Sequence, residues 1–112
     1  MSTVLVQINR SQEVIDTIAR EAAKRGITGA SITLIGAVQQ ATVSVMKKND
    51  STVDYLREYD QPLEFTGTGE ITADGVHIHA TLAGEDVIAA GHLHSATVQD
   101  FFVRAYITPL TD

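Results

Sequence analysis

All four histidines of this 112-residue chain fall within eighteen consecutive residues. They are His77, His79, His92 and His94. They belong to two runs rich in β-branched and aliphatic residues, Val76 to Leu82 and Val87 to Leu93, which Ala-Gly-Glu-Asp separates. Two such runs on either side of a short turn-forming break predict a β-hairpin. Because side chains two apart on a strand share a face, each run holds a histidine pair on one face.

The turn sets the register of this hairpin. With Gly84 and Glu85 as the two central turn residues, His77 is predicted to lie opposite His92, and all four imidazoles share one face. A slip of one residue would divide the histidines between the two faces. In the predicted register the other face is apolar and carries Ile78, Ala80, Leu82, Val87, Ala89 and Leu93.

Three of the histidines are candidate metal ligands. Directly opposite Cβ atoms on neighbouring strands are ~4.5–5.5 Å apart and same-strand neighbours ~6.6–6.8 Å apart, so three imidazole nitrogens can converge on one cation at ~2.0–2.1 Å. We predict that His77, His79 and His92 bind zinc or another divalent transition metal and leave one position open for a small molecule or anion. His94 is the weakest candidate because it stands at the predicted strand end.

The alternative is that the histidines only form structural hydrogen bonds in an interaction module, since two His-x-His pairs arise without a metal. The chain has no cysteine, which excludes disulfides and thiolate ligands and leaves imidazole, with carboxylate, to hold a transition metal. Glu64, Glu70 and Asp74 are candidate bases near such a metal. An exposed carboxylate on or beside a strand is common, so no catalytic residue is assigned.

The run Gly-x-His-x-His-Ala-x-Leu, followed by Gly-His-Leu, resembles the signature of the PPC domain of plants and prokaryotes. Ile27 to Gln40 is similar to the family's Gly-Ala-Val strand, and Pro62 to Ile71 to its Glu-x-x-x-x-Gly-x-Ile strand. The resemblance implies a compact domain that assembles as a homotrimer. It also implies a metal held by the histidines that match His77, His79 and His92.

The resemblance leaves several functions open. Prokaryotic relatives often carry a DNA-binding label by analogy with plant relatives, which add an AT-hook, but this chain has no Arg-Gly-Arg-Pro-like core. The family fold also resembles acetolactate decarboxylase, whose zinc is held by histidines, so a metal-dependent lyase or hydrolase acting on a small molecule is a further alternative. Two departures from the family pattern are Ala90-Gly91-His92, where two glycines are usual, and Phe101-Phe102-Val103, where Thr-x-Glu is usual.

Length and composition indicate one soluble globular domain over residues 1–112, because 44% hydrophobic and 20% charged residues are an ordinary globular balance. No apolar run approaches the ~20 residues needed to span a bilayer, so no membrane partner is expected. The N-terminus has neither a basic start nor a cleavage site. We therefore expect a cytoplasmic protein.

The net charge of the chain and one long apolar segment indicate which partners to expect. Eight Lys and Arg against fourteen Asp and Glu give a formal charge of −6, and a trimer would carry −18. Such a surface disfavours DNA as a partner, because nucleic-acid affinity comes mainly from phosphate neutralisation. Thr97 to Thr108 is almost continuously apolar, as expected of a strand covered by the core on one side and a partner subunit on the other.

The whole pattern predicts an α+β fold, a mostly antiparallel sheet of about six or seven strands covered on one face by one main α-helix. The helix is predicted over Ser11 to Arg25, with Ser11 as its N-cap and Gly26 at its left-handed end. Besides the hairpin, the predicted strands are Val4 to Ile8, Ala30 to Val38, Ala41 to Met46, Leu63 to Thr72 and Thr97 to Thr108. Lys47 to Gln61 is polar and is predicted as a long connection with a short strand around Tyr55 to Tyr59.

Overall fold

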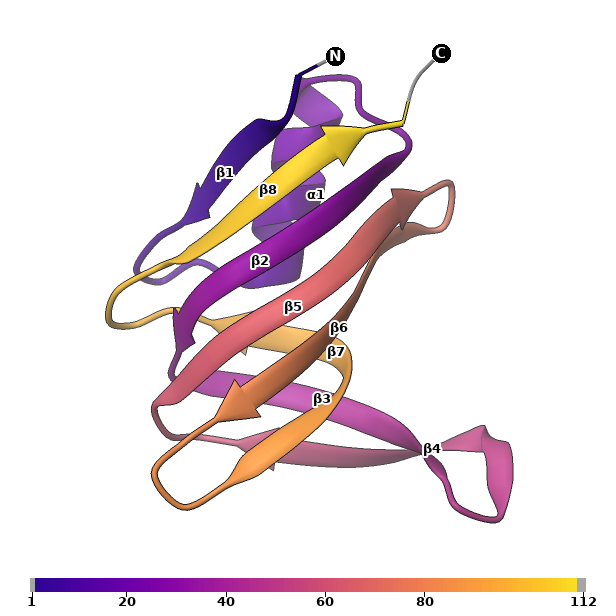
Figure 1. Cartoon of the computed structure of the whole chain (residues 1–112), viewed down its shortest axis with the longest axis vertical. Helices are drawn as coiled ribbons and strands as arrows, with labels where there is room; N and C mark the ends of the chain where they lie inside the picture. The colour runs from indigo at the N-terminus through magenta and orange to yellow at the C-terminus, as the bar shows by residue number, and fades with distance from the viewer. Residues whose placement is uncertain (1, 111–112) are drawn as a thin grey trace.

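The computed structural model describes residues 2–110 as one helix and an eight-stranded antiparallel sheet (Figure 1). The predicted fold class is confirmed, with eight strands rather than six or seven. The strand order across the sheet is β1-β8-β2-β5-β6-β7-β3-β4. In chain order the elements are β1 (Val4–Ile8), α1 (Val14–Lys24), β2 (Ala30–Val38), β3 (Gln40–Lys47), β4 (Asp50–Tyr59), β5 (Leu63–Thr72), β6 (Gly75–Ala83), β7 (Ile88–Thr97) and β8 (Val103–Pro109).

Helix α1 covers one face of the sheet, behind β1, β8 and β2 in Figure 1. Its apolar residues Val14, Ile18 and Ala22 recur at helical spacing and are buried. Along each covered strand, buried and exposed side chains alternate, which is the period of a sheet with one face on the core. Phe65 of β5 is fully buried in this core. Within residues 2–110 no helix is long and apolar enough to cross a membrane.

The helix begins three residues later than predicted. Glu13 is the N-cap, and its Oε1 accepts a hydrogen bond from the backbone N–H of Asp16 at 2.8 Å. Ser11 instead adopts a left-handed φ of 70° and donates its backbone N–H to the carbonyl oxygen of Val98 at 2.8 Å. The predicted cap at Ser11 is therefore wrong, because Ser11 is used to join the helix entry to the end of β7.

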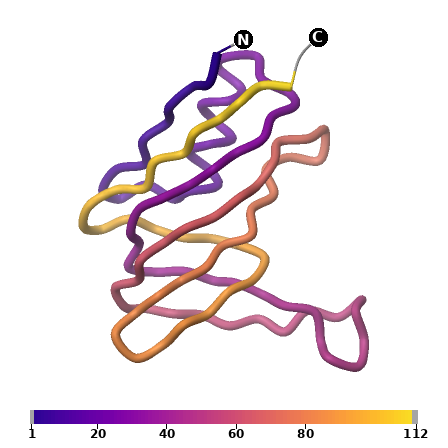
Figure 2. Tube along the Cα trace, in the orientation of Figure 1, coloured from indigo at the N-terminus to yellow at the C-terminus, as the bar shows by residue number. Residues whose placement is uncertain are grey.

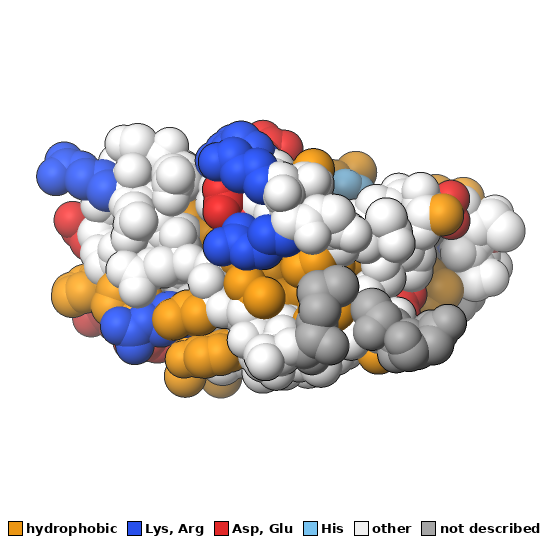
Figure 3. All heavy atoms as spheres, turned by 90° about the horizontal axis from the view of Figure 1, so that it is seen from above, with side chains coloured by type: hydrophobic (Ala, Val, Ile, Leu, Met, Phe, Trp, Pro, Cys, Tyr) orange, Lys and Arg blue, Asp and Glu red, His pale blue; other side chains and the backbone are white. Residues whose placement is uncertain are grey.

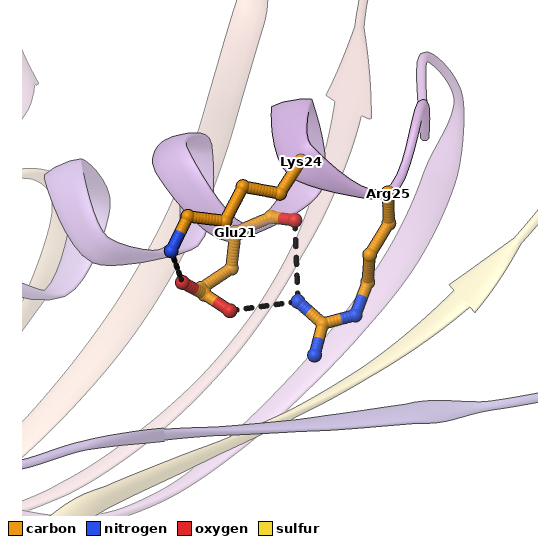
Figure 4. Close-up of polar contacts among 3 residues, drawn as sticks. All are labelled: Glu21, Lys24 and Arg25. Atoms are coloured by element: carbon orange, nitrogen blue, oxygen red, sulfur yellow. Dashed lines mark hydrogen bonds and ion pairs between the residues drawn. The ribbon is translucent and has the colours of Figure 1, made fainter.

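The end of the helix follows the prediction. Gly26 has a φ of 67°, the left-handed conformation that glycine adopts without steric cost. In the last turn, Glu21 accepts from Arg25 at 2.8 Å and from Lys24 at 3.1 Å (Figure 4). The hydrogen bond from Arg25, followed by that from Lys24, lowers the pKa of Glu21. These pairs are exposed, so they contribute little to stability.

Strands β3 and β4 form a hairpin that projects from the body of the molecule (Figure 2). The prediction that Lys47 to Gln61 forms a long connection with only a short strand is wrong. β4 is the edge strand, and nearly all of its side chains are exposed or half-buried on both faces. The alternation that reveals a half-buried strand is consequently missing from its sequence.

The last strand is shorter than predicted, because β7 continues through Thr97 and residues 98–102 form a loop. The side chain of Gln39 holds this loop by accepting from the backbone N–H groups of Gln99 at 2.6 Å and Asp100 at 2.7 Å. Phe101 lies in the loop and is 78% exposed. In β8 only alternate residues are buried, so the single chain covers this strand on one side. The predicted cover on the other side, by a partner subunit, stays a prediction.

The face of the sheet turned away from α1 is called the outer face. Its side chains are exposed or half-buried and include Thr33, Ile35, Thr66, Thr68, Glu70, His77, His79, Thr81, Ala90, His92 and Tyr106. The described ends of the chain lie together at one end of the sheet. Seen from that end, Lys and Arg side chains stand beside Asp and Glu side chains and exposed hydrophobic ones (Figure 3).

Candidate metal centre

The predicted histidine hairpin is present as β6 and β7, with a register that differs from the prediction by two residues. His79, rather than His77, lies directly opposite His92. The turn has four residues, Gly84 to Val87, and is closed by a 2.8 Å hydrogen bond from the N–H of Gly84 to the carbonyl oxygen of Val87. A shift of two residues leaves every side chain on its predicted face, so the histidines still share the outer face.

His92 is the centre of the cluster. Its ring centroid lies 6.1 Å from that of His79, 6.4 Å from that of His77 and 4.9 Å from that of His94. Two imidazoles bound to one tetrahedral ion, with Zn–N bonds of about 2.0–2.1 Å, have centroids about 5 Å apart. The predicted ligands His77, His79 and His92 are thus brought together on one face, with the first two rings about 1 Å farther from His92 than ligation requires. The His94 ring already lies at that spacing from His92.

Among residues 2–110, no group of three or more His, Cys, Asp or Glu side chains is preassembled to hold an ion. The donor set nevertheless fits zinc, because His77 and His79 are exposed and their rings are free to turn toward His92. Neutral imidazole is the form that binds zinc. Burial lowers the pKa of His92, and the nearby His94, His79 and His77 lower it further, while Asp54 acts in the opposite direction.

The lowered pKa of His92 predicts its behaviour in acid. The unfolded chain takes up the proton near the ordinary histidine value of about 6.5, and the folded chain only at a lower pH. The contribution of His92 to stability is therefore complete above about 6.5 and is lost as the pH falls below it. An NMR titration of the metal-free protein should place the His92 midpoint below about 6.5. A midpoint above that value would contradict the expected shift.

His94 has a separate role from the other three histidines. It lies inside β7 rather than at a strand end, and pairing with β3 skips it, since Thr42 pairs with Ser95 and Val43 with Leu93. His94 is therefore the extra residue of a β-bulge. Its Nε2 is 2.7 Å from the hydroxyl oxygen of the buried Ser44. This hydrogen bond occupies one ring nitrogen, while the His94 ring is the one nearest to His92, at 4.9 Å. That His94 is the outlying member of the site stays a prediction.

Three cavities adjoin the histidines, and the one of about 800 Å³ is lined by His79 together with Thr33, Ile35, Thr66, Ala90 and Tyr106. The other two contain more of the cluster. One, of about 290 Å³, is lined by Thr68, Gly69, Glu70, His77 and His79. The other, of about 570 Å³, is lined by Ser44, Val45, Met46, Asp54, His79, Gly91 and His92. A small ligand in any of the three cavities would lie beside His79.

The candidate bases Glu64, Glu70 and Asp74 differ in whether they line a cavity together with the histidines. Glu70 lines a cavity with two of the histidines, whereas Glu64 pairs with Ala83 at the other end of β5, and Asp74 lies in the turn between β5 and β6. Asp54 is an acidic residue of the site that sequence reasoning missed. It lies on β4, and the polar, exposed sequence of that strand gave no sign that it reaches the histidines.

The comparison of the sequence with known families decides the family. The Plants and Prokaryotes Conserved domain matches residues 1–111. This chain belongs to that family. Its histidine hairpin therefore lies within a Plants and Prokaryotes Conserved domain. No curated protein sequence matches the chain at a significant level.

Solved structures share the fold. A metal-containing protein of Archaeoglobus fulgidus is 26% identical, with a TM-score of 0.89 over 99% of this chain and 81% of that chain. A family member from Pyrococcus horikoshii is 21% identical, with a TM-score of 0.83 over 100% and 80% of the two chains. Proteins of Ralstonia eutropha and Bacteroides thetaiotaomicron, at 23% and 22% identity, are called candidate DNA-binding proteins.

A decarboxylase with lower sequence identity also shares the fold. The α-acetolactate decarboxylase of Bacillus subtilis is 12% identical, with a TM-score of 0.69 over 96% of this chain and 52% of the enzyme. This likeness shows the fold alone, so the architecture of a Plants and Prokaryotes Conserved domain is also that of part of a lyase.

Proposed function

We propose that this protein binds one divalent transition metal, zinc, through His77, His79 and His92. The observation that carries the proposal is the placement of the first two rings 6.4 and 6.1 Å from His92 on the exposed outer face. The related metal-containing protein of Archaeoglobus fulgidus supports it. The donor chemistry also supports it, because zinc accepts imidazole ligands in tetrahedral sites that keep one position open.

The open position defines what such a site can do. Bound zinc supplies Lewis-acid polarisation of a carbonyl or phosphoryl oxygen. The adjoining cavity of about 570 Å³, which Asp54 also lines, would hold a small molecule or anion beside His79 and His92. The fold likeness to acetolactate decarboxylase makes a lyase or hydrolase reaction on a small molecule the second candidate function.

Elemental analysis of protein purified without a metal-affinity tag tests the proposal. We expect about one zinc ion per chain, and a loss of that metal in the variant in which His77, His79 and His92 are all replaced by Ala. The His94→Ala variant is the matched control and should retain its metal. Wild-type protein free of transition metal, or equal metal in wild type and the triple variant, would contradict the proposal.

We propose in addition that the chain assembles as a homotrimer, with the part of the outer face around Ile35 and Tyr106 in the interface. Helix α1 covers only one face of the sheet. Apolar residues on the opposite, outer face would usually be covered by another layer of structure. Ile35 and Tyr106 are 55% and 39% exposed on the outer face. Together with Thr33, Thr66 and Ala90 they line a shallow cavity of about 800 Å³, which a second copy would cover.

Sedimentation equilibrium at micromolar concentration checks the assembly. We expect three times the chain mass of 12.0 kDa. Exchanging the apolar Ile35 and Tyr106 for Ser should shift the population toward the monomer, whereas Leu110→Ser, which changes a more exposed apolar residue outside the sheet, should not. A wild-type mass that stays at one chain over the concentration range would rule out the trimer.

DNA binding is expected to be weak. The formal charge is −6 per chain, and the end of the molecule in Figure 3 mixes basic with acidic side chains, so there is little source of counterion release. Titration of a labelled generic duplex at two salt concentrations should show no binding in the micromolar range at physiological salt. Tight binding with a steep salt dependence would instead favour the function for which the Ralstonia and Bacteroides proteins are named.

A further inference from the structure

Glu70 occupies a distinctive place relative to the histidines. It lies on β5, directly opposite His77 of β6, and His79 of β6 in turn lies opposite His92 of β7. Strand β6 is therefore between Glu70 and His92. An ion shared by His77 and His92 would lie on the β7 side of His77, whereas Glu70 stands on the β5 side. Glu70 would therefore reach His77 from the side away from the ion.

The two strands approach closely at this point. A Cβ atom on Gly69 would overlap the carbonyl oxygen of His77, so the absence of a side chain allows the backbones of β5 and β6 to come together beside Glu70. Directly opposite Cβ atoms in such a pair are about 4.5–5.5 Å apart, a spacing that a Glu side chain can bridge to an imidazole nitrogen. Glu70 and His77 also line the same cavity of about 290 Å³.

We infer that Glu70 is a positioning residue for His77, and this inference rests on the zinc site proposed above. When one nitrogen of His77 binds the ion, the other ring N–H donates a hydrogen bond to the Glu70 carboxylate. This bond fixes the tautomer and the ring orientation and raises the basicity of the ligating nitrogen. Ser44 gives a parallel on the other side of the cluster, since its hydroxyl holds the ring of His94 at 2.7 Å.

The other acidic residues do not have this placement. Glu64 is on the same strand and the same face, but six residues away and opposite Ala83. Asp54 reaches the cavity from β4 and is separated from β6 by β3 and β7. Glu64 is therefore a matched control, because replacing it removes the same charge from the same face without touching His77.

Zinc affinity, measured by competition with a chelator, tests the role of Glu70. We expect Glu70→Ala to weaken zinc binding about 10–100-fold, the usual cost of losing a partner of a ligating histidine. Glu70→Gln keeps an acceptor oxygen and should lose less, while Glu64→Ala and Glu64→Gln should match wild type. Both positions are exposed, so the thermal unfolding of the metal-free variants should be unchanged.

A second measurement reports the hydrogen bond itself. In the zinc-loaded wild type, the ¹⁵N shifts of His77 should show one tautomer with a slowly exchanging ring N–H, and Glu70→Ala should lose that slow exchange. Equal zinc affinity in Glu70→Ala and Glu64→Ala, with an unchanged His77 spectrum, would overturn the inference while leaving the histidine site intact. Absence of zinc binding by the wild type would overturn the proposed function itself.

Discussion

His79→Ala is expected to weaken zinc binding by more than about 100-fold, since even the loss of a partner behind a ligand costs about 10–100-fold. His79 lies directly opposite His92 and lines all three cavities beside the cluster. Its side chain is exposed, and the variant should unfold at the same temperature as the metal-free wild type. Competition with a chelator measures the loss.

His94→Ala is the control for this prediction. His94 is the bulge residue held by Ser44, so its loss should change zinc affinity much less than the loss of His79. If both variants lost zinc equally, the site would include His94 as a full ligand. If neither lost it, these histidines would be structural hydrogen-bonding residues, and the metal proposal would be wrong.

Gly91→Ala is expected to destabilise the fold strongly, by about 3 kcal/mol. A Cβ atom at this position would overlap the carbonyl oxygen of Ser44 and lie 3.1 Å from its carbonyl carbon, so the backbone of β3 or β7 has to move. Because Gly91 precedes His92, the same displacement should weaken zinc binding. Urea unfolding of the metal-free protein measures the first effect, and chelator competition the second.

Gly29→Ala is the matched control for Gly91→Ala. The nearest atom to a Cβ at Gly29 is the carbonyl oxygen of Ile71 at 4.0 Å, an ordinary contact. This variant should unfold within about 0.5 kcal/mol of wild type. Equal stability of the two variants would show that β3 and β7 have room to separate beside His92.

The sequence predicts those parts of the fold where one face of an element is buried. The two-residue period of β6 and β7 places His77, His79 and His92 on one face, and this assignment holds although the register differs by two residues. Register itself was not predictable, because Ala-Gly-Glu-Asp is compatible with a turn of two or four residues. The hydrogen bond from the N–H of Gly84 to the carbonyl oxygen of Val87 shows that the turn has four residues.

The features that were predicted wrongly or missed have a common physical reason, because no local pattern of buried residues determines them. β4 is exposed along nearly its whole length, so its sequence carries no alternation, and Asp54 could not be placed near the histidines. Ser11 is a good N-cap by residue type, but a contact with Val98 far along the chain decides its conformation. The opposition of Glu70 and His77 likewise depends on which strands are neighbours, and no local pattern contains that information.

Calorimetric titration of zinc into the metal-stripped wild-type protein tests the central claim most directly. We predict saturable binding of one ion per chain near neutral pH, weakening below about pH 6.5 as protons compete for the imidazoles. A titration without saturable heat near neutral pH, or the same binding curve for the His77→Ala, His79→Ala and His92→Ala variants, would contradict it.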